Sequence, residues 1–167
     1  MAQILVRQIV VPKSSFDAPE PWELMCANEV FVHRVMRDGL YEHSELLPDC
    51  VMLYHVLEYD RQVGNGGHEQ YLSNRGWKSE VNEIVQSGLI AIGATQIAEL
   101  FRVIRTYVNA IPEDREKMRL RGGFNDIGGG SGKVDRGVQL YDKEYYRLGR
   151  EKQLTSYGSE FLRHHPA

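Results

Sequence analysis

The chain has 167 residues, enough for one domain to bury a hydrophobic core without disulfide or metal staples. Its 20 basic and 23 acidic residues give a net charge of −3, which excludes a globally basic nucleic-acid-binding surface and a globally acidic one. With two cysteines, no apolar run of about 18 residues and no signal-peptide pattern, the sequence predicts a cytoplasmic protein with reduced thiols and no membrane association.

The charges are unevenly distributed along the chain. Residues 1–60 contain ten acidic and four basic side chains, whereas residues 61–167 contain thirteen acidic and sixteen basic ones. The N-terminal third is therefore the acidic part of the protein.

Residues 4–12 are short, β-branched and ended by Pro12, a pattern that predicts a strand. A lone strand leaves its backbone unpaired, so we expect it to pair with residues 134–140 or with a second copy of the chain. Residues 1–20 are interpreted as an arm and linker that precede a helical domain at residues 21–167.

Residues 22–37 predict an amphipathic helix that ends at Asp38-Gly39. Its expected core residues are Leu24, Met25, Val30, Phe31, Val35 and Met36. A metal site built from Cys26, His33, Cys50 and His55 is not expected, because the closely spaced ligand pairs of metal sites are missing.

Residues 40–47 form an acidic bridge that contains Glu42 and Glu45. Pro48 suits the first turn of the next predicted helix, which covers residues 49–61.

The next stretch combines glycine bends with amide side chains. Asn65 is expected to cap a two-turn helix over residues 67–73, and Asn74 and Gly76 to end it. Gln70 stands four residues before Asn74, so both amides lie on one face. We interpret them as partners of open backbone groups at the two bends; the alternative is a recognition pocket.

Residues 78–92 predict another helix, which residues 93–95 interrupt. Thr95 is expected to cap the following helix, and the two helices should form an antiparallel pair. The second helix carries a clear apolar stripe of Ile97, Leu100, Phe101, Ile104 and Val108.

Residues 112–121 are charged and predict a solvated helical turn. Between Gly122 and Gly137 seven of sixteen residues are glycine, which predicts a loop. Gly128, Ser131 and Lys133 suggest a phosphate-binding loop, but Ile127 and Val134 break the pattern, so a plain flexible loop is preferred.

Two more helices complete the chain: one that Asp142 is expected to cap, and a last one over residues 153–165. The predicted fold is mainly α, with about six or seven helices, a short N-terminal strand and a glycine-rich loop before the last helices. His68 and Glu69 are adjacent and point in different directions, and no nucleophile is placed beside them. We therefore predict no catalytic residues, no cofactor and no metal.

The glycine bend carries a family resemblance. The residues that carry it are Asn65, Gly66, Gly67, Gln70, Tyr71, Leu72, Asn74 and Gly76, followed later by Asp142, Tyr145 and Tyr146. They resemble a bacterial family of helical proteins whose best-known member is a DNA mimic, and the resemblance covers residues 46–167. It implies a helical fold and a protein partner, namely a DNA-binding protein bound through an acidic helical face. His68 departs from the family, which usually has an aromatic residue at this position.

Three functional alternatives remain open. The leading one is a non-enzymatic protein-interaction domain of unknown precise role, for which the resemblance implies a DNA-binding protein as partner, and not nucleic acid itself, bound through Glu42, Glu45, Asp49, Glu58 and Asp60. The preferred alternative for these five carboxylates is the solvated face of ordinary helices. The second is a small-ligand binder or enzyme with a pocket between Asn65–Gly67 and Gly122–Gly137. The third is an immunity-type or structural partner that acts as a homodimer.

Overall fold

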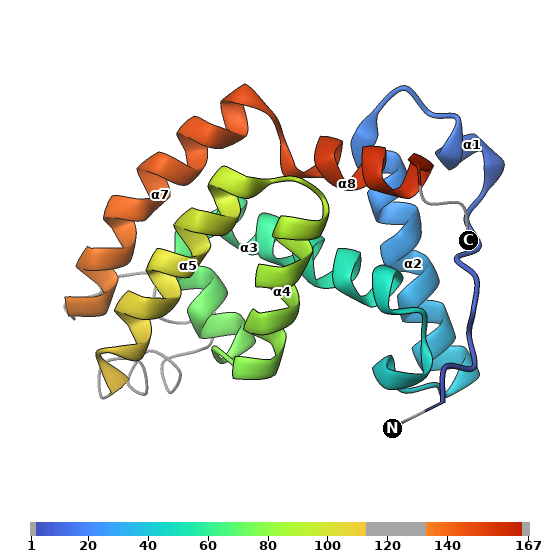
Figure 1. The fold of residues 1–167 in the computed structure, drawn as a ribbon, viewed down its shortest axis with the longest axis horizontal. Coiled ribbons are helices and arrows are strands. Elements are labelled where there is room, and N and C mark those ends of the chain that lie inside the picture. The colour runs from blue at the N-terminus through green and yellow to red at the C-terminus, as the bar shows by residue number, and fades with distance from the viewer. Residues whose placement is uncertain (1–2, 113–132, 165–167) are drawn as a thin grey trace.

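The structure, a computed structural model, describes residues 3–112 and 133–164, with side chains of the second range from residue 137 onward. It is a mainly α single-domain bundle, as predicted, with seven α-helices in the described ranges (Figure 1). The helices are α1 (Lys13–Phe16), α2 (Pro21–Gly39), α3 (Pro48–Arg75), α4 (Ser79–Ala91), α5 (Thr95–Asn109), α7 (Lys133–Glu151) and α8 (Leu154–His164), and a 3₁₀ turn, η1 (His43–Glu45), precedes α3.

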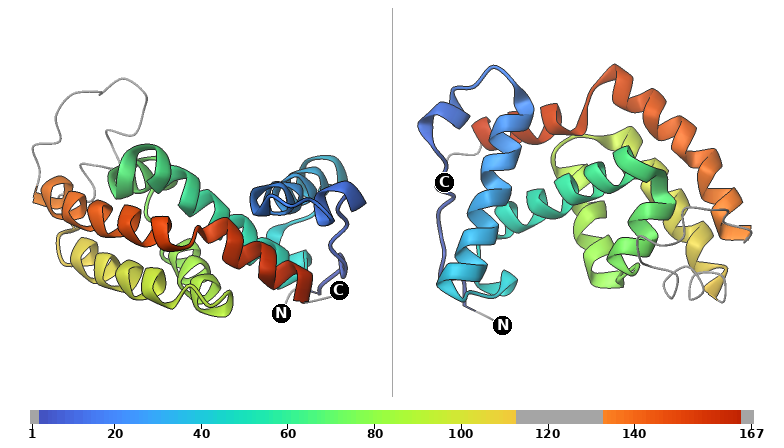
Figure 2. Two further views of the ribbon diagram at one scale, coloured as in Figure 1. Left: turned by 90° about the horizontal axis from the view of Figure 1, so that it is seen from above. Right: turned by 180° about the vertical axis from the view of Figure 1, so that it is seen from behind.

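Helix α3 is the central element of the bundle. It packs against α2 and α8 on one side and against α4 and α7 on the other, while α5 packs against α4 and α7 (Figures 1 and 2). Pro48 occupies the first turn of α3, where its missing N–H costs no hydrogen bond. Helix α3 therefore crosses the whole bundle, and at its bend Gly67 is buried against α7 whereas Gly66 is exposed.

The main hydrophobic core is built around aromatic residues of α3 and α5. Tyr59, Tyr71 and Phe101 are fully buried and make edge-to-face contacts with one another, with ring centroids 4.8–6.2 Å apart. The apolar stripe predicted for residues 97–108 is buried throughout. A smaller cluster beside the N-terminal segment consists of Val32, Leu46, Cys50, Val51 and Tyr54.

The predicted strand at residues 4–12 is wrong for the described chain. This segment is extended but makes a single bridge, between Val6 and Leu46, in which the Leu5 and Val6 N–H groups both donate to the Glu45 carbonyl at 2.8 and 3.0 Å. The partner proposed for it, residues 134–140, lies in α7 instead. The β-branched residues serve to pack against the smaller core cluster, which Val6 and Ile9 cover.

The glycine-rich loop was predicted five residues too long at its C-terminal end. Helix α7 begins at Lys133 and includes Gly137, whereas residues 122–132 lie outside the described residues, as does most of the charged stretch at 112–121. A Cβ atom at Gly137 would overlap the Tyr107 ring of α5. Glycine is thus needed here for close helix packing, which outweighs its poor helix propensity.

Smaller corrections concern the helix ends and one core residue. Thr95 is the first residue of α5 and makes no side-chain cap, since Ala94 occupies the cap position. Val30, expected in the core, is 48% exposed because it lies on the outer side of α2. No helix of residues 3–112 or 133–164 is long and apolar enough to cross a membrane.

Candidate functional site

The bend in α3 lies at the glycines that the sequence singled out. Gly66 has φ −149° and ψ 25°, and Gly67 has φ 72° and ψ −175°, a combination that residues with a side chain rarely adopt. The helix therefore continues from Gly67 to Arg75 in a new direction and ends at Gly76, whose φ is 67°. The predicted two-turn helix is real, although it is the second part of one long bent element.

Asp142, and not Asn65, caps the second part of α3. Asn65 is exposed, whereas the Asp142 carboxylate reaches across from the middle of α7 and accepts the His68 backbone N–H at 2.9 Å. We predicted that Asp142 caps its own helix; in the structure it lies inside α7 and caps the second part of α3 instead. A Cβ atom at Gly67 would overlap this carboxylate, so the glycine also makes room for the cap.

The His68 side chain links Asp142 to Tyr59. Its Nδ1 atom lies 2.5 Å from the same Asp142 oxygen, and its Nε2 atom lies 2.9 Å from the Tyr59 hydroxyl. A carboxylate oxygen can only accept, so Nδ1 donates to Asp142, and Nε2 forms the second hydrogen bond of the ring with the Tyr59 hydroxyl. The carboxylate thus satisfies a helix terminus and a buried ring together.

Aromatic rings enclose this network. Tyr59 and His68 are 0% exposed, and the Tyr145 ring packs edge-on against both. The Tyr145 hydroxyl donates to Asp60, and burial raises the pKa of Asp60 and of both tyrosines. The carboxylate–imidazole–phenol series resembles a proton relay, but the His68 and Tyr59 side chains are fully buried in this structure, where the series links α3 to α7.

The two amides of the motif meet a third amide. Gln70 Nε2 and Asn74 Nδ2 both donate to Gln62 Oε1, at 3.0 and 2.7 Å. We predicted backbone partners, and the structure shows a side-chain partner one turn before the bend. The Tyr71 hydroxyl, also in the motif, donates to Asn82 of α4 at 3.0 Å, so five motif and partner side chains tie the bend to its surroundings.

The five predicted acidic residues fall into two groups. Glu58 pairs with Arg75 at 3.1 Å, and Asp60 accepts the Tyr145 hydroxyl, so both are used inside the fold. Glu42 caps η1, Glu45 ends it and Asp49 lies in the first turn of α3, and none of the three has a Lys or Arg partner among the described residues. We call these three residues the acidic corner.

Local structure holds the acidic corner in place. The Glu42 N–H donates to the Glu45 carboxylate at 2.8 Å, and the Glu42 carboxylate accepts the Glu45 N–H in return, a reciprocal capping box. Asp49 lies at the positive end of the α3 dipole, which favours its charge. Between Arg37 and Arg61 the sequence has six carboxylates and no Lys or Arg, and burial lowers the pKa of His43, which keeps that ring neutral near pH 7.

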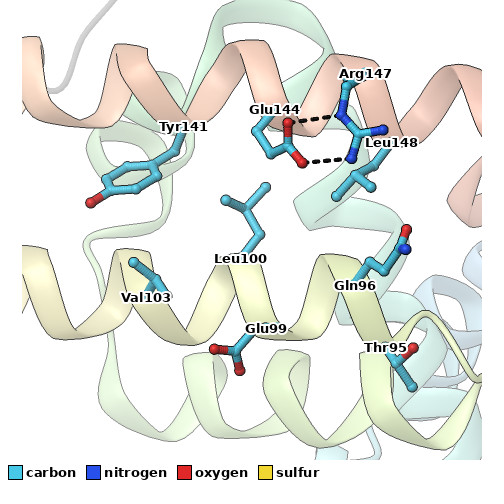
Figure 3. Close-up of a pocket in the computed structure, with 9 residues that line it drawn as sticks. All are labelled: Thr95, Gln96, Glu99, Leu100, Val103, Tyr141, Glu144, Arg147 and Leu148. Atoms are coloured by element: carbon cyan, nitrogen blue, oxygen red, sulfur yellow. Dashed lines mark hydrogen bonds and ion pairs between the residues drawn. The ribbon is translucent and has the colours of Figure 1, made fainter.

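A groove of about 580 Å³ lies between α5 and α7, away from the bend (Figure 3). Leu100 and Val103 face α7 from α5, and Glu144 pairs with Arg147 on the opposite side. This groove is not the pocket predicted between Asn65–Gly67 and Gly122–Gly137. The Asn65–Gly67 side of that predicted pocket lies next to the His68 network, and Gly128 and Ser131 on its other side lie outside the described residues. Lys133 is the first residue of α7.

The cysteine and histidine candidates for a metal site have other contacts. Cys50 Sγ donates to the Leu47 carbonyl at 3.0 Å, and the Arg61 guanidinium donates to Cys26 Sγ at 3.2 Å. The His33 and His55 rings both pack against Tyr54. In the part of the chain that the structure describes, no group of three or more His, Cys, Asp or Glu side chains is placed to hold a metal ion.

Sequence reasoning missed the two contacts that define the site. The His68–Asp142 pair joins residues 74 positions apart in the sequence. The Glu58–Arg75 pair likewise joins the two parts of α3 across the bend. Neither pairing has a local sequence signal.

Fold and site define a mainly α bundle whose buried polar network ties its helices together, and in which three neighbouring carboxylates at η1 and the start of α3 have no Lys or Arg partner among the described residues. The chain belongs to the DMP19-like protein family, which it matches over residues 44–165. This confirms the predicted family, and at the level of the family it indicates a DNA-mimic, protein-interaction role; the family is not one of known enzymes. No protein of curated function and no solved structure matches the chain.

Proposed function

We propose that this protein is a non-enzymatic interaction domain that binds a DNA-binding protein through the acidic corner of Glu42, Glu45 and Asp49. The observation that carries the proposal is that these carboxylates have no basic partner within the described chain, in a member of a family named after a DNA mimic. Lysine and arginine side chains that bind DNA phosphates are suitable partners for them.

The modest net charge makes this a short-range interaction. With a charge of −3 the chain produces little long-range attraction, and at physiological salt charges are screened beyond about 8–10 Å. The corner therefore acts by contact, as a local substitute for a few phosphates. Glu58 and Asp60, which the sequence placed in the same face, contribute less to the proposed surface because Arg75 and Tyr145 engage them.

The buried network favours a binding role over an enzymatic one. The histidine best placed to act as a base, His68, is 0% exposed and has partners at both ring nitrogens. General base catalysis needs a group within hydrogen-bond reach of its substrate. Binding through a rigid surface needs only that this network hold α3 in shape.

Affinity capture tests the proposal. The tagged chain is incubated with lysate of its native cells, and retained proteins are identified and then challenged with duplex DNA or with free mononucleotide at the same phosphate concentration. We expect a retained DNA-binding protein that the duplex releases and the mononucleotide does not. A specifically retained partner that ignores duplex DNA, or no retained partner, would contradict the proposal.

A further inference from the structure

Leu40, two residues before the acidic corner, is the most exposed large apolar side chain of the described residues. It is 84% exposed, and it ends α2 in the left-handed conformation with φ 58°. This conformation disfavours any residue with a Cβ atom and suits glycine. A leucine here combines an unfavourable backbone conformation with an unburied side chain, and neither feature helps the isolated fold.

The neighbouring residues explain how Leu40 is held outward. Its N–H donates to the Val35 carbonyl and closes the last turn of α2. The Tyr41 ring packs over Gly39, where a Cβ atom would lie 2.8 Å from the ring. The glycine of this turn therefore makes room for Tyr41, while Leu40 takes the left-handed position and projects into solvent.

The position of Leu40 connects it to the acidic corner. Glu42, the cap of η1, follows Tyr41 directly, and Tyr41 is itself 36% exposed. Protein interfaces combine a few apolar anchors with a polar rim, and the anchors contribute most of the binding energy. Leu40 and Tyr41 next to unpaired carboxylates have this composition.

We propose that Leu40, supported by Tyr41, is the apolar anchor with which the acidic corner docks onto a basic, DNA-binding face of a partner protein. This inference rests on the proposed function. Charge decides the kind of partner: from Asp38 to Asp60 the chain has no Lys or Arg, so a surface rich in basic side chains complements it. The partner face must also offer an apolar depression for one leucine side chain.

The anchor and the carboxylates affect different rate constants. Within about 8–10 Å, the range that salt screening leaves, the carboxylates attract and orient the approaching partner, so their removal lowers the association rate and the salt dependence of binding. An apolar anchor holds the formed complex, so its removal raises the dissociation rate at every salt concentration. The dissociation rate therefore tests the role of Leu40 separately from that of the carboxylates.

The test uses the purified protein that duplex DNA releases from the wild-type chain. Its binding kinetics are measured with wild type, Leu40→Ala, Leu40→Gly and the control Ile90→Ala, which truncates a 58% exposed aliphatic residue on α4. We expect both Leu40 variants to dissociate at least about tenfold faster with unchanged salt dependence, as for an interface anchor, and the control to behave as wild type. Leu40→Gly should also raise the Tm by about 2–4 °C, because it removes the left-handed leucine.

Three results would overturn the inference. If the Leu40 variants dissociate as slowly as wild type while neutralising the carboxylates still abolishes binding, Leu40 is not an anchor and the proposed function stands. A lower Tm for Leu40→Gly would show that Leu40 stabilises the free fold and is not kept for a partner. If no protein is retained and released by DNA, the proposed function fails, and the anchor fails with it.

Discussion

The bend of α3 and the acidic corner are both rich in polar residues, yet they differ in what satisfies those residues. At the bend, His68 has Asp142 and Tyr59 as partners, and the Gln62 oxygen accepts two amides. At the corner, Glu42, Glu45 and Asp49 are fixed by local backbone contacts but have no partner of opposite charge among the described residues. Polar groups that are satisfied internally hold the fold, and those left unpaired at the surface are available to a partner.

The same distinction divides one acidic stretch of the sequence. Glu58 and Asp60 belong to the bend side of α3, where Arg75 and Tyr145 engage them, while Glu42 and Glu45 belong to the corner. Substitutions at the bend should therefore affect stability, and substitutions at the corner should affect binding.

The largest effect on stability is expected at Asp142. Asp142→Ala removes the acceptor of the His68 ring and of the first amide after the bend, so about 4 kcal/mol of the free energy of unfolding should be lost. Asp142→Asn keeps a carbonyl oxygen at the same place and should lose clearly less. Denaturant unfolding of the two variants measures the difference; equal losses would show that the acceptor is not the reason for the stability.

A methyl group at the bend should be the next most damaging change. Gly67→Ala introduces a Cβ atom at φ 72° that also overlaps the Asp142 carboxylate, so we expect a loss of about 3 kcal/mol. Gly64→Ala is the matched control, because a Cβ there meets no atom within 4 Å. Thermal unfolding of both variants checks this, and a similar Tm for the two would contradict the role of Gly67.

Acid should destabilise the protein through His55, which lies in α3 beside the smaller core. Burial lowers the pKa of His55 from 6.5 to about 4, so the unfolded chain binds the proton more strongly than the folded one. The contribution of His55 to the free energy of unfolding is fully present above the pKa of the unfolded chain. It is lost as the pH drops from there towards 4, and the loss amounts to about 3 kcal/mol.

The variant His55→Leu isolates this contribution. Between pH 7 and pH 4 the free energy of unfolding of wild type should fall further than that of His55→Leu, and the two decreases should differ by about 3 kcal/mol. Denaturant unfolding of both proteins at a series of pH values between 7 and 4 measures this difference. Parallel pH profiles for wild type and His55→Leu would mean that His55 is not buried as a neutral ring.

The smallest effect is expected in the amide cluster. Gln62→Ala removes the oxygen that Gln70 and Asn74 share, and because this cluster is only partly buried the loss should be about 1 kcal/mol. Gln62→Glu keeps an acceptor for both amides and should be milder. If the alanine variant were as stable as wild type, the cluster would not contribute to the bend.

The sequence predicted the helices well because their apolar periodicity and their proline and glycine ends are local signals. It did not predict the cap of the second part of α3, since Asp142 lies 74 residues from His68 and only the fold brings them together. For the same reason it placed Lys133–Gly137 in a loop: glycine composition is local, whereas the contact of Gly137 with Tyr107 is not. The sequence also could not show that Asp60 is engaged inside the fold, because its partner Tyr145 lies 85 residues away.

The most direct test of the account is a comparison of two triple variants of equal charge in the capture experiment. One neutralises the acidic corner with Glu42→Gln, Glu45→Gln and Asp49→Asn, which keeps the local hydrogen-bond acceptors. The other neutralises three exposed glutamates of α4 and α5 with Glu80→Gln, Glu83→Gln and Glu99→Gln. We predict that both variants unfold like wild type, and that only the corner variant loses the protein that duplex DNA releases. Equal retention of that protein by the two variants would contradict the account.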